Sequence, residues 1–260
     1  MKKQAIKTNL LGSVKRQLLQ AALALCVIAL VWVVAHFIVG NELLLPDFFA
    51  CAKESVLLLG KQAFWDSFLA TLVRVLSAFL IALVMAAALG FLAYRFTWLY
   101  RFFAPFIALL RSLPTLAVLL IILVWSGAAV APVTVAVMSL FPMLYTALTS
   151  ALFEVQDDLK EMSRVYNVPV KTQILQLYAP AVAPYVIREG GGALAFSLKL
   201  VVSAEVLAGT YRSLGGMMQD AKLYVEMPTL FALVILTFLV GLLFEFIAAL
   251  LAEAAERRLR

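Results

Sequence analysis

Long uncharged stretches constrain the fold of this chain more than any other feature. The stretch "LSAFLIALVMAAALGFLAY" at 76–94 contains no charged residue, and about 20 apolar residues suffice to cross a bilayer as a helix. Only 14% of the 260 residues are charged, whereas soluble domains have about 25%. Because the apolar runs are continuous and not alternating, they indicate membrane helices and not a β-barrel. The expected fold class is an all-α polytopic membrane protein.

Six transmembrane helices are expected, so both ends of the chain should lie on one side of the membrane. The first follows a basic tail at 1–20, and its apolar core is longer than that of a typical signal peptide, so an uncleaved anchor is expected. A short amphipathic helix is expected in the loop between the first two spans. The expected spans are 21–40, 67–93, 103–126, 130–152, 181–209 and 228–252.

The distribution of lysine and arginine predicts the orientation of these spans. Cytoplasmic loops of membrane proteins are enriched in basic residues. One side carries only Lys53, Lys61, Arg212 and Lys222. The other side carries Lys2, Lys3, Lys7, Lys15, Arg16, Arg95, Arg101, Lys160, Arg164, Lys171, Arg257, Arg258 and Arg260. Both termini are therefore expected in the cytoplasm, and the net charge of +6 needs no nucleic-acid partner.

A polar segment at 161–180, "EMSRVYNVPVKTQILQLYAP", separates the fourth and fifth spans on the expected cytoplasmic side. Asn167 tolerates the left-handed conformation that ends many helices, and Pro169 suits the first turn of a new helix. The segment therefore predicts a helix, a sharp turn and a second helix at the membrane surface. An ordinary amphipathic linker resting on lipid headgroups explains the periodicity equally well.

The spacing in this segment resembles the cytoplasmic "EAA" loop of ABC importer permeases. That loop reads Glu-Ala-Ala, three residues, Gly, nine residues, then Ile-x-Leu-Pro. Glu161 and Pro180 match it, whereas other residues occupy its remaining positions: Met162, Ser163, Asn167, Leu177 and Ala179. Three further stretches are similar to permeases of the nitrate/sulfonate/taurine importer group: "FWDSFLATLVRVLSAFLIALVMAAALGFL", "FIALLRSLPTLAVLLIILVWSG" and "VVSAEVLAGTYRSLGGMMQDAK". In that group the arginine-Ser-x-Pro and "AE-x-L" patterns of the last two stretches lie in equivalent spans. The resemblance covers about 60–255.

This resemblance implies a type I ABC importer (MetI-like) permease fold, with a permease core at 60–255 and a coupling loop at 154–180. The implied ATPase-coupling residues are Glu161, Met162, Ser163, Asn167, Pro169 and Pro180. It also implies a bacterial cytoplasmic (inner) membrane location. The implied partners are two cytoplasmic ATPase subunits, a second copy of the permease in a homodimer, and a periplasmic or lipid-anchored solute-binding protein. The substrate stays open within the group.

ATP and Mg²⁺ are expected on the partner ATPase, and no cofactor is expected in this chain. The sequence contains no Walker A motif, G-x-x-x-x-G-K-[ST]. The single histidine, His36, cannot build a metal site alone, and Cys26 and Cys51 lie too far apart in the expected topology to predict a disulfide. No catalytic or metal-binding residues are expected.

Ionisable residues inside membrane spans are costly and often mark functional sites. The translocation-path or gating candidates are Arg74, Arg111, Lys199 and Glu205. By depth, Arg74 and Glu205 are expected in the outer half of the membrane and Lys199 near its middle. Glu245 and Arg111 are expected in the inner half. These charges either line the path of the solute or form ion pairs that brace the helices.

Three consecutive glycines, Gly190, Gly191 and Gly192, lie in the fifth expected span. Each costs about 1 kcal/mol relative to alanine in a helix, so close helix packing or a hinge should offset that cost.

Two other classes of protein remain alternatives on the sequence alone. An ATP-independent secondary transporter or channel would explain the spans and the charges, but not the spacing from Glu161 to Pro180. A non-transporting membrane scaffold would leave the intramembrane charges unexplained.

Overall fold

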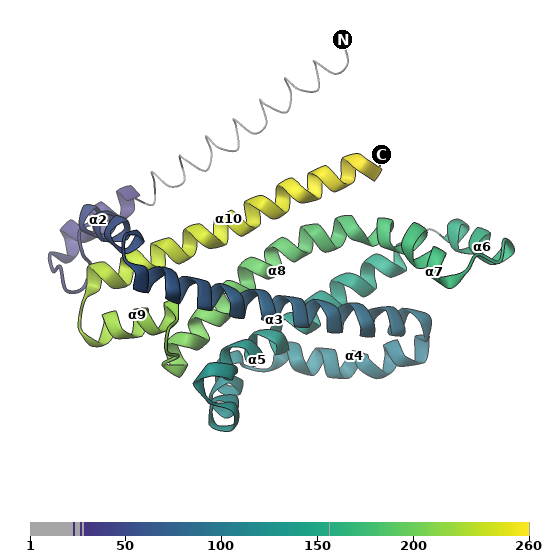
Figure 1. Cartoon of the computed structure of the whole chain (residues 1–260), viewed down its shortest axis with the longest axis horizontal. Helices are drawn as coiled ribbons and strands as arrows, with labels where there is room; N and C mark the ends of the chain where they lie inside the picture. The colour runs from purple at the N-terminus through teal and green to yellow at the C-terminus, as the bar shows by residue number, and fades with distance from the viewer. Residues whose placement is uncertain (1–22, 24–26, 28, 156, 260) are drawn as a thin grey trace, which may run out of the picture.

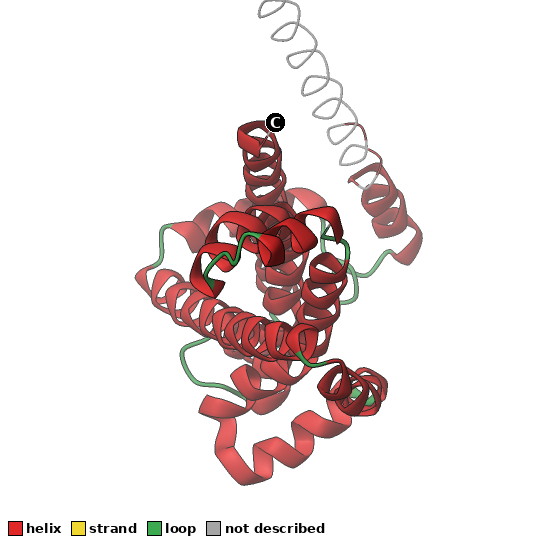
Figure 2. Ribbon diagram, turned by 90° about the vertical axis from the view of Figure 1, so that its right-hand side faces the viewer, coloured by secondary structure: helices red, strands yellow, loops and turns green. Residues whose placement is uncertain are grey.

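The computed structural model describes residues 23, 27, 29–155 and 157–259, and every regular element in this part is a helix (Figure 2). The basic tail at 1–20 and residues 21, 22, 24–26 and 28 of the first expected span at 21–40, Cys26 among them, lie outside the described residues. The described end of that span is an apolar helix, Ala29–Val39.

The helices pack side by side in a single elongated bundle (Figure 1). In chain order they are α2 (Phe48–Leu59), α3 (Gln62–Arg95), α4 (Thr97–Ser112), α5 (Thr115–Phe153), α6 (Asp157–Val165), α7 (Val170–Gln173), a π-helical turn (Ile174–Tyr178), α8 (Ala179–Ala208), α9 (Leu214–Leu223) and α10 (Met227–Leu259). Helices α6 and α7 lie at one end of the bundle, and α2 and α9 lie at the other (Figure 1).

Small residues form the face by which α3 packs into the core. Ala78, Ala82, Ala86 and Gly90 recur every four residues and are all buried, which places them on one side of the helix. A Cβ added at Gly90 would lie 3.5 Å from Cγ2 of Thr149 on α5. The backbones of α3 and α5 therefore approach closely, as at other small-residue interfaces between membrane helices.

The expected third span, 103–126, is wrong as a single helix, because the chain breaks at Leu113 and Pro114. Helix α4 ends at Ser112 and α5 begins at Thr115. Proline lacks a backbone N–H and disfavours the helical conformation of the residue before it. Leu113 is accordingly extended, with φ −66° and ψ 131°.

Helix α5 bends at Gly127, at the boundary expected between the third and fourth spans. Gly127 has φ 73° and ψ 172°, a conformation that glycine adopts at little cost. The hydroxyl of Thr210, in the loop after α8, donates to the carbonyl oxygen of Ala128 at 2.8 Å. This bond satisfies a backbone acceptor at the bend and ties the bend to the α8–α9 loop.

The expected second, fifth and sixth spans correspond to α3, α8 and α10, and the amphipathic helix expected before them corresponds to α2. In the described part, four helices are long and apolar enough to cross a membrane: the segments Gln62–Arg95, Thr115–Phe153, Glu189–Ala208 and Met227–Leu251. The all-α polytopic class is confirmed. The count of six spans stays a prediction, since the described continuous helix of the first span is only Ala29–Val39 and the third span is divided.

The three glycines of α8 have different surroundings, and the helix continues through them without a break. A Cβ on Gly191 would overlap the Cβ of Ala248 on α10, whereas a Cβ on Gly192 would meet nothing within 4 Å. A Cβ on Gly190 would make an ordinary contact with Phe79, at 3.6 Å. Close packing therefore explains Gly191, and nothing in the structure explains Gly192.

We expect Gly191→Leu to destabilise the protein because it forces α8 away from α10. Overpacking of this kind costs about 1–3 kcal/mol, and thermal unfolding in detergent measures it. Gly192→Leu is the matched control and should leave the unfolding temperature nearly unchanged. Equal stability of the two variants would show that the α8–α10 contact does not limit side-chain size.

Candidate functional site

A fully buried carboxylate, that of Glu205 on α8, is the centre of the best-defined polar site. Its side chain is 0% exposed and pairs with Arg74 of α3, whose Nη1 donates to Oε1 at 2.9 Å. The hydroxyl of Thr71 lies 3.1 Å from Oε1 and 2.9 Å from Oε2. The backbone N–H of Gly215 donates to Oε2 at 3.2 Å. A buried charge requires such partners.

Three elements bring these groups together. Thr71 and Arg74 are three residues apart on α3 and therefore share a face. Glu205 lies in the last turn of α8, which ends at Gly209 in the left-handed conformation (φ 61°), and Thr210 N–H donates to the Glu205 carbonyl at 3.1 Å. The chain then turns back, so that Leu214 N–H donates to Thr71 Oγ1 at 2.9 Å.

Helix α9 approaches α8 closely because its second residue, Gly215, has no side chain. A Cβ on Gly215 would lie 2.6 Å from the backbone nitrogen of Val206 and 2.7 Å from the carbonyl oxygen of Val202. Only glycine fits this position, and the close approach lets its N–H reach Glu205. Ser213 caps the same helix, since its Oγ accepts from Gly216 N–H at 2.8 Å.

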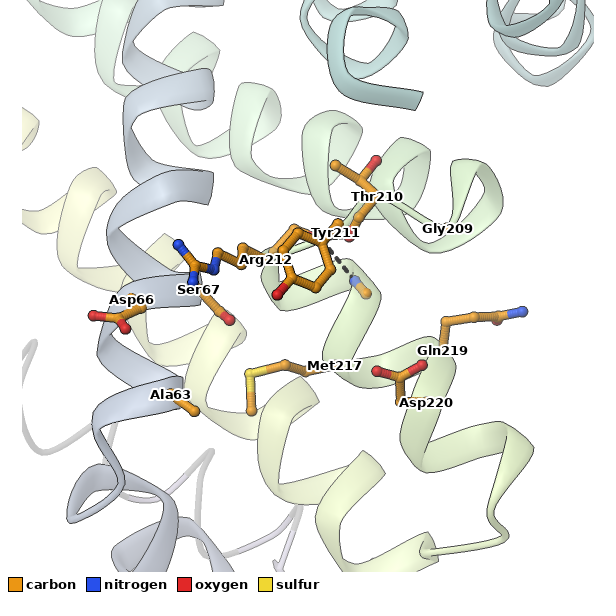
Figure 3. Close-up of a pocket in the computed structure, with 12 residues that line it drawn as sticks. Ala63, Asp66, Ser67, Gly209, Thr210, Tyr211, Arg212, Met217, Gln219 and Asp220 are labelled. Carbon is orange, nitrogen blue, oxygen red and sulfur yellow. Dashed lines mark hydrogen bonds between the residues drawn. The ribbon is translucent and has the colours of Figure 1, made fainter. Parts of the chain in front are cut away.

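An open cavity of about 430 Å³ adjoins the Glu205 site between α3, the α8–α9 loop and α9 (Figure 3). Arg212 extends toward α3 across the cavity, while Gln219 and Asp220 project from α9 (Figure 3). The backbone carbonyl of Arg212 also lies 3.4 Å from Nη1 of Arg74. The Glu205 site therefore fixes one wall of this cavity.

The segment at 154–180 folds as a helix, a turn and a helix. Asn167 is left-handed, with φ 47°, and the N–H of Val168 donates to the carbonyl of Ser163 at 3.0 Å. This is the Schellman arrangement that ends many helices. Pro169 then precedes α7, and the side chain of Gln173 donates to the carbonyl of Val168 at 2.8 Å. The predicted turn at Asn167 and Pro169 is confirmed.

Several large apolar side chains of this segment are exposed. Glu161 is also exposed, Ser163 is buried, and Pro180 is half-buried at the start of α8. The exposed apolar residues of the segment are Met162, Val165, Tyr166, Val170 and Leu175. They lie at the far end of the bundle from the Glu205 site (Figure 1).

Of the four translocation-path candidates, two contact each other in the structure and the other two lie apart from them. Arg74 and Glu205 form one ion pair. Lys199 is exposed on α8, and Arg111 is exposed in the last turn of α4. Sequence reasoning missed Thr71 and Gly215. The spacing of Thr71 from Arg74 could have indicated the first, but no local signal indicates that Gly215 contacts Glu205.

A family model matches 78–260 of this chain, that of the binding-protein-dependent transport system inner membrane component. The chain belongs to this family. Two similar relatives are probable ABC transporter permease proteins of Brucella melitensis biotype 1 and Brucella abortus (strain 2308). Each is 30% identical over 208 residues, which are 80% of this chain and 82% and 81% of the relatives.

Solved structures of two ABC transporters contain chains with the same fold. A chain of the inward-facing MetNI methionine ABC transporter superposes with a TM-score of 0.65 at 15% identity, over 74% of this chain and 96% of that one. A chain of an amino acid ABC transporter with histidines gives 0.63 at 16% identity, over 80% and 98%. The protein is thus an ABC importer permease component with the MetI-like fold.

Loss of the Arg74 guanidinium should strongly destabilise this permease, because it leaves the Glu205 charge buried without its ionic partner. Breaking a buried pair in this way costs about 3–5 kcal/mol. We expect Arg74→Met to lower the thermal unfolding temperature in detergent. Glu205→Gln in the same chain should restore part of the loss.

The exposed pair of Lys61 and Glu54, at 3.2 Å, provides the control. Exposed ion pairs contribute about 0–1 kcal/mol, so Lys61→Met should change the unfolding temperature little. If Arg74→Met is as mild as Lys61→Met, the buried pair does not brace the bundle.

Proposed function

We propose that this permease transmits the motion of a separate cytoplasmic ATPase into the membrane through the segment at 154–180. The observation that carries the proposal is the shape of the segment: a short helix, a fixed turn and a second helix that continues into α8. Because α7 and the π-helical turn lead directly into α8, a displacement of α7 would displace α8 as well. An unstructured linker would absorb the same displacement.

The exposed face of the segment supports a protein partner at this end. Met162, Val165 and Tyr166 are 54–75% exposed on one short helix and its end. Contiguous exposed apolar side chains rimmed by charge are typical of interaction sites. The neighbouring carboxylate of Glu161 is exposed as well, so it can accept a hydrogen bond or a cation from the same partner.

The complete importer would contain two permease copies, two ATPase subunits and a solute-binding protein. The family's description as binding-protein-dependent supports the last of these. The spacing of the "EAA"-like loop supports the ATPases, on which ATP hydrolysis would take place. The family's description as an inner membrane component supports an inner-membrane location, and the distribution of basic residues supports cytoplasmic termini.

The solute would come from the range handled by the nitrate/sulfonate/taurine group, since the arginine-Ser-x-Pro and "AE-x-L" patterns of this chain resemble that group. In the proposed path the Arg74–Glu205 pair holds the wall of the outer cavity, while Lys199 remains available to the solute. Arg111, at the end of α4, remains a candidate further along the path. The close approach of Gly191 to Ala248 supports a packing role for this glycine.

Reversal of charge at Glu161 tests the coupling. We expect Glu161→Lys to abolish co-purification of the ATPase, or to leave ATP hydrolysis that no longer drives uptake into proteoliposomes containing the binding protein. Transport should fall by about tenfold or more, because a cation replaces an anion at the contact. Glu161→Gln should be milder.

Glu226→Lys is the matched control, since Glu226 is exposed before α10, at the opposite end of the bundle. A folded Glu161→Lys variant that transports at the wild-type rate would reduce the segment to a linker. Uptake driven by an ion gradient without ATP would instead support the secondary-transporter alternative.

The turn at Asn167 gives a second test that leaves the charge unchanged. Asn167→Gly should keep full transport, because glycine adopts the left-handed conformation readily. Asn167→Val should weaken coupling, since a β-branched residue is strained there by about 1–2 kcal/mol. Equal transport by the two variants would show that the turn geometry does not matter for coupling.

A further inference from the structure

A second cavity, of about 420 Å³, lies between α8 and α10 and contains two intramembrane charges that the Glu205 site does not use. Its polar lining is Lys199, Ser203, Thr237 and Glu245. The remaining lining is mostly apolar: Leu198, Val202, Val206, Met218, Val234, Phe238 and Leu242. A mostly apolar concavity of this size with a few polar groups is typical of sites for small solutes.

Lys199 and Glu245 are both exposed, and within the part of the chain that the structure describes neither forms an ion pair or a hydrogen bond. This contrasts with Arg74 and Glu205, which partner each other. A charged side chain is costly against lipid and usually faces water or the interior of the bundle. The groove is therefore better suited to a polar occupant than to acyl chains.

The register of α8 against α10 gives the separation of the two charges. Gly191 faces Ala248, and a Cβ on Gly241 would lie 3.9 Å from Leu198. The helices therefore run antiparallel, with Lys199 near the level of Val240. Glu245 lies five residues further toward the α6–α7 end, a displacement of about 7.5 Å along the helix axis. That spacing separates a positive and a negative site within one groove.

We propose that this groove binds the solute as a small zwitterion, with its acidic group against Lys199 and its basic group toward Glu245. The apolar lining, including Val202 and Phe238, would contact the body of the solute. The two charges of opposite sign favour a zwitterion over a simple anion or cation, for which one of the two would be repulsive. This inference rests on the proposed transport function and adds the class of solute.

The test places a cysteine in the groove and measures how fast charged reagents reach it. The substitution is Ser203→Cys, one helical turn from Lys199, and Cys26→Ser removes one native thiol. Cys51 stays in place, because it is buried and its burial raises the pKa of the thiol to about 11. The reagents are methanethiosulfonates that carry either a sulfonate or a trimethylammonium group, applied to the full chain in membrane vesicles.

We expect both reagents to label the thiol introduced at position 203. Lys199→Gln should lower the rate ratio of the sulfonate to the trimethylammonium reagent by about fivefold, because it removes a charge close to the thiol. Glu245→Gln should raise the ratio, and Lys199→Arg should preserve it. Arg95→Gln, at the exposed end of α3 and outside the groove, is the matched control and should leave the ratio unchanged.

The class of solute is tested by protection from labelling. The probes are 4-aminobutyrate, butyrate and butylammonium, which share a carbon chain and differ in charge. At equal concentration 4-aminobutyrate should slow labelling most, and either Lys199→Gln or Glu245→Gln should remove its advantage. Equal protection by butyrate would overturn the zwitterion assignment in favour of an anion.

Failure of both reagents to label the Ser203→Cys variant would also overturn the proposal, because the groove would then be covered by lipid or by a second copy of the chain. A second copy could pair Lys199 of one protomer with Glu245 of the other across a two-fold axis. These measurements need neither ATP nor the ATPase. Their failure is therefore distinguishable from a failure of the coupling proposal, which the Glu161 variants test.

Discussion

The buried ion pair between Arg74 and Glu205 is the interaction on which the α9 end of this permease depends. A carboxylate with no exposed surface is stable only when its hydrogen-bond sites are satisfied, and here α3 and α9 supply the donors to α8. The pair therefore fixes three helices relative to one another. It also positions the α8–α9 loop, in which the Thr210 hydroxyl donates a hydrogen bond to the carbonyl oxygen of Ala128 at the bend of α5.

Helix α8 connects this site with the proposed coupling segment. Its 30 residues extend over about 45 Å, with Glu205 near one end and the π-helical turn Ile174–Tyr178 next to the other. Its middle packs against α10 through Gly191 and forms a wall of the groove that contains Lys199. A displacement that begins at the proposed coupling segment would reach both the groove and the cavity beside the Glu205 site, because a helix with no internal break moves as a unit.

Sequence patterns predict the parts of the fold that depend on residues close together in the chain. Continuous apolar runs predict α3, α8 and α10, and Asn167 with Pro169 predicts the turn in the coupling segment. The third span was misjudged because hydropathy alone ignored Pro114, which ends the helical conformation at Leu113. The Glu205 site could not be assembled from sequence, since Arg74 and Glu205 are 131 positions apart. The need for glycine at 215 arises only once α9 has folded back onto α8.

The two sets of intramembrane charges show how similar residues come to have different uses. Arg74 and Glu205 satisfy each other, so the site has no net charge to offer a passing ion and its role is to hold helices together. Lys199 and Glu245 lie on facing helices of the same groove, yet their levels differ by about a turn and a half of helix. Had their levels matched, they would form a second brace. Because they do not match, each keeps an unused charge, and the groove between them is left with the polarity that a binding site requires.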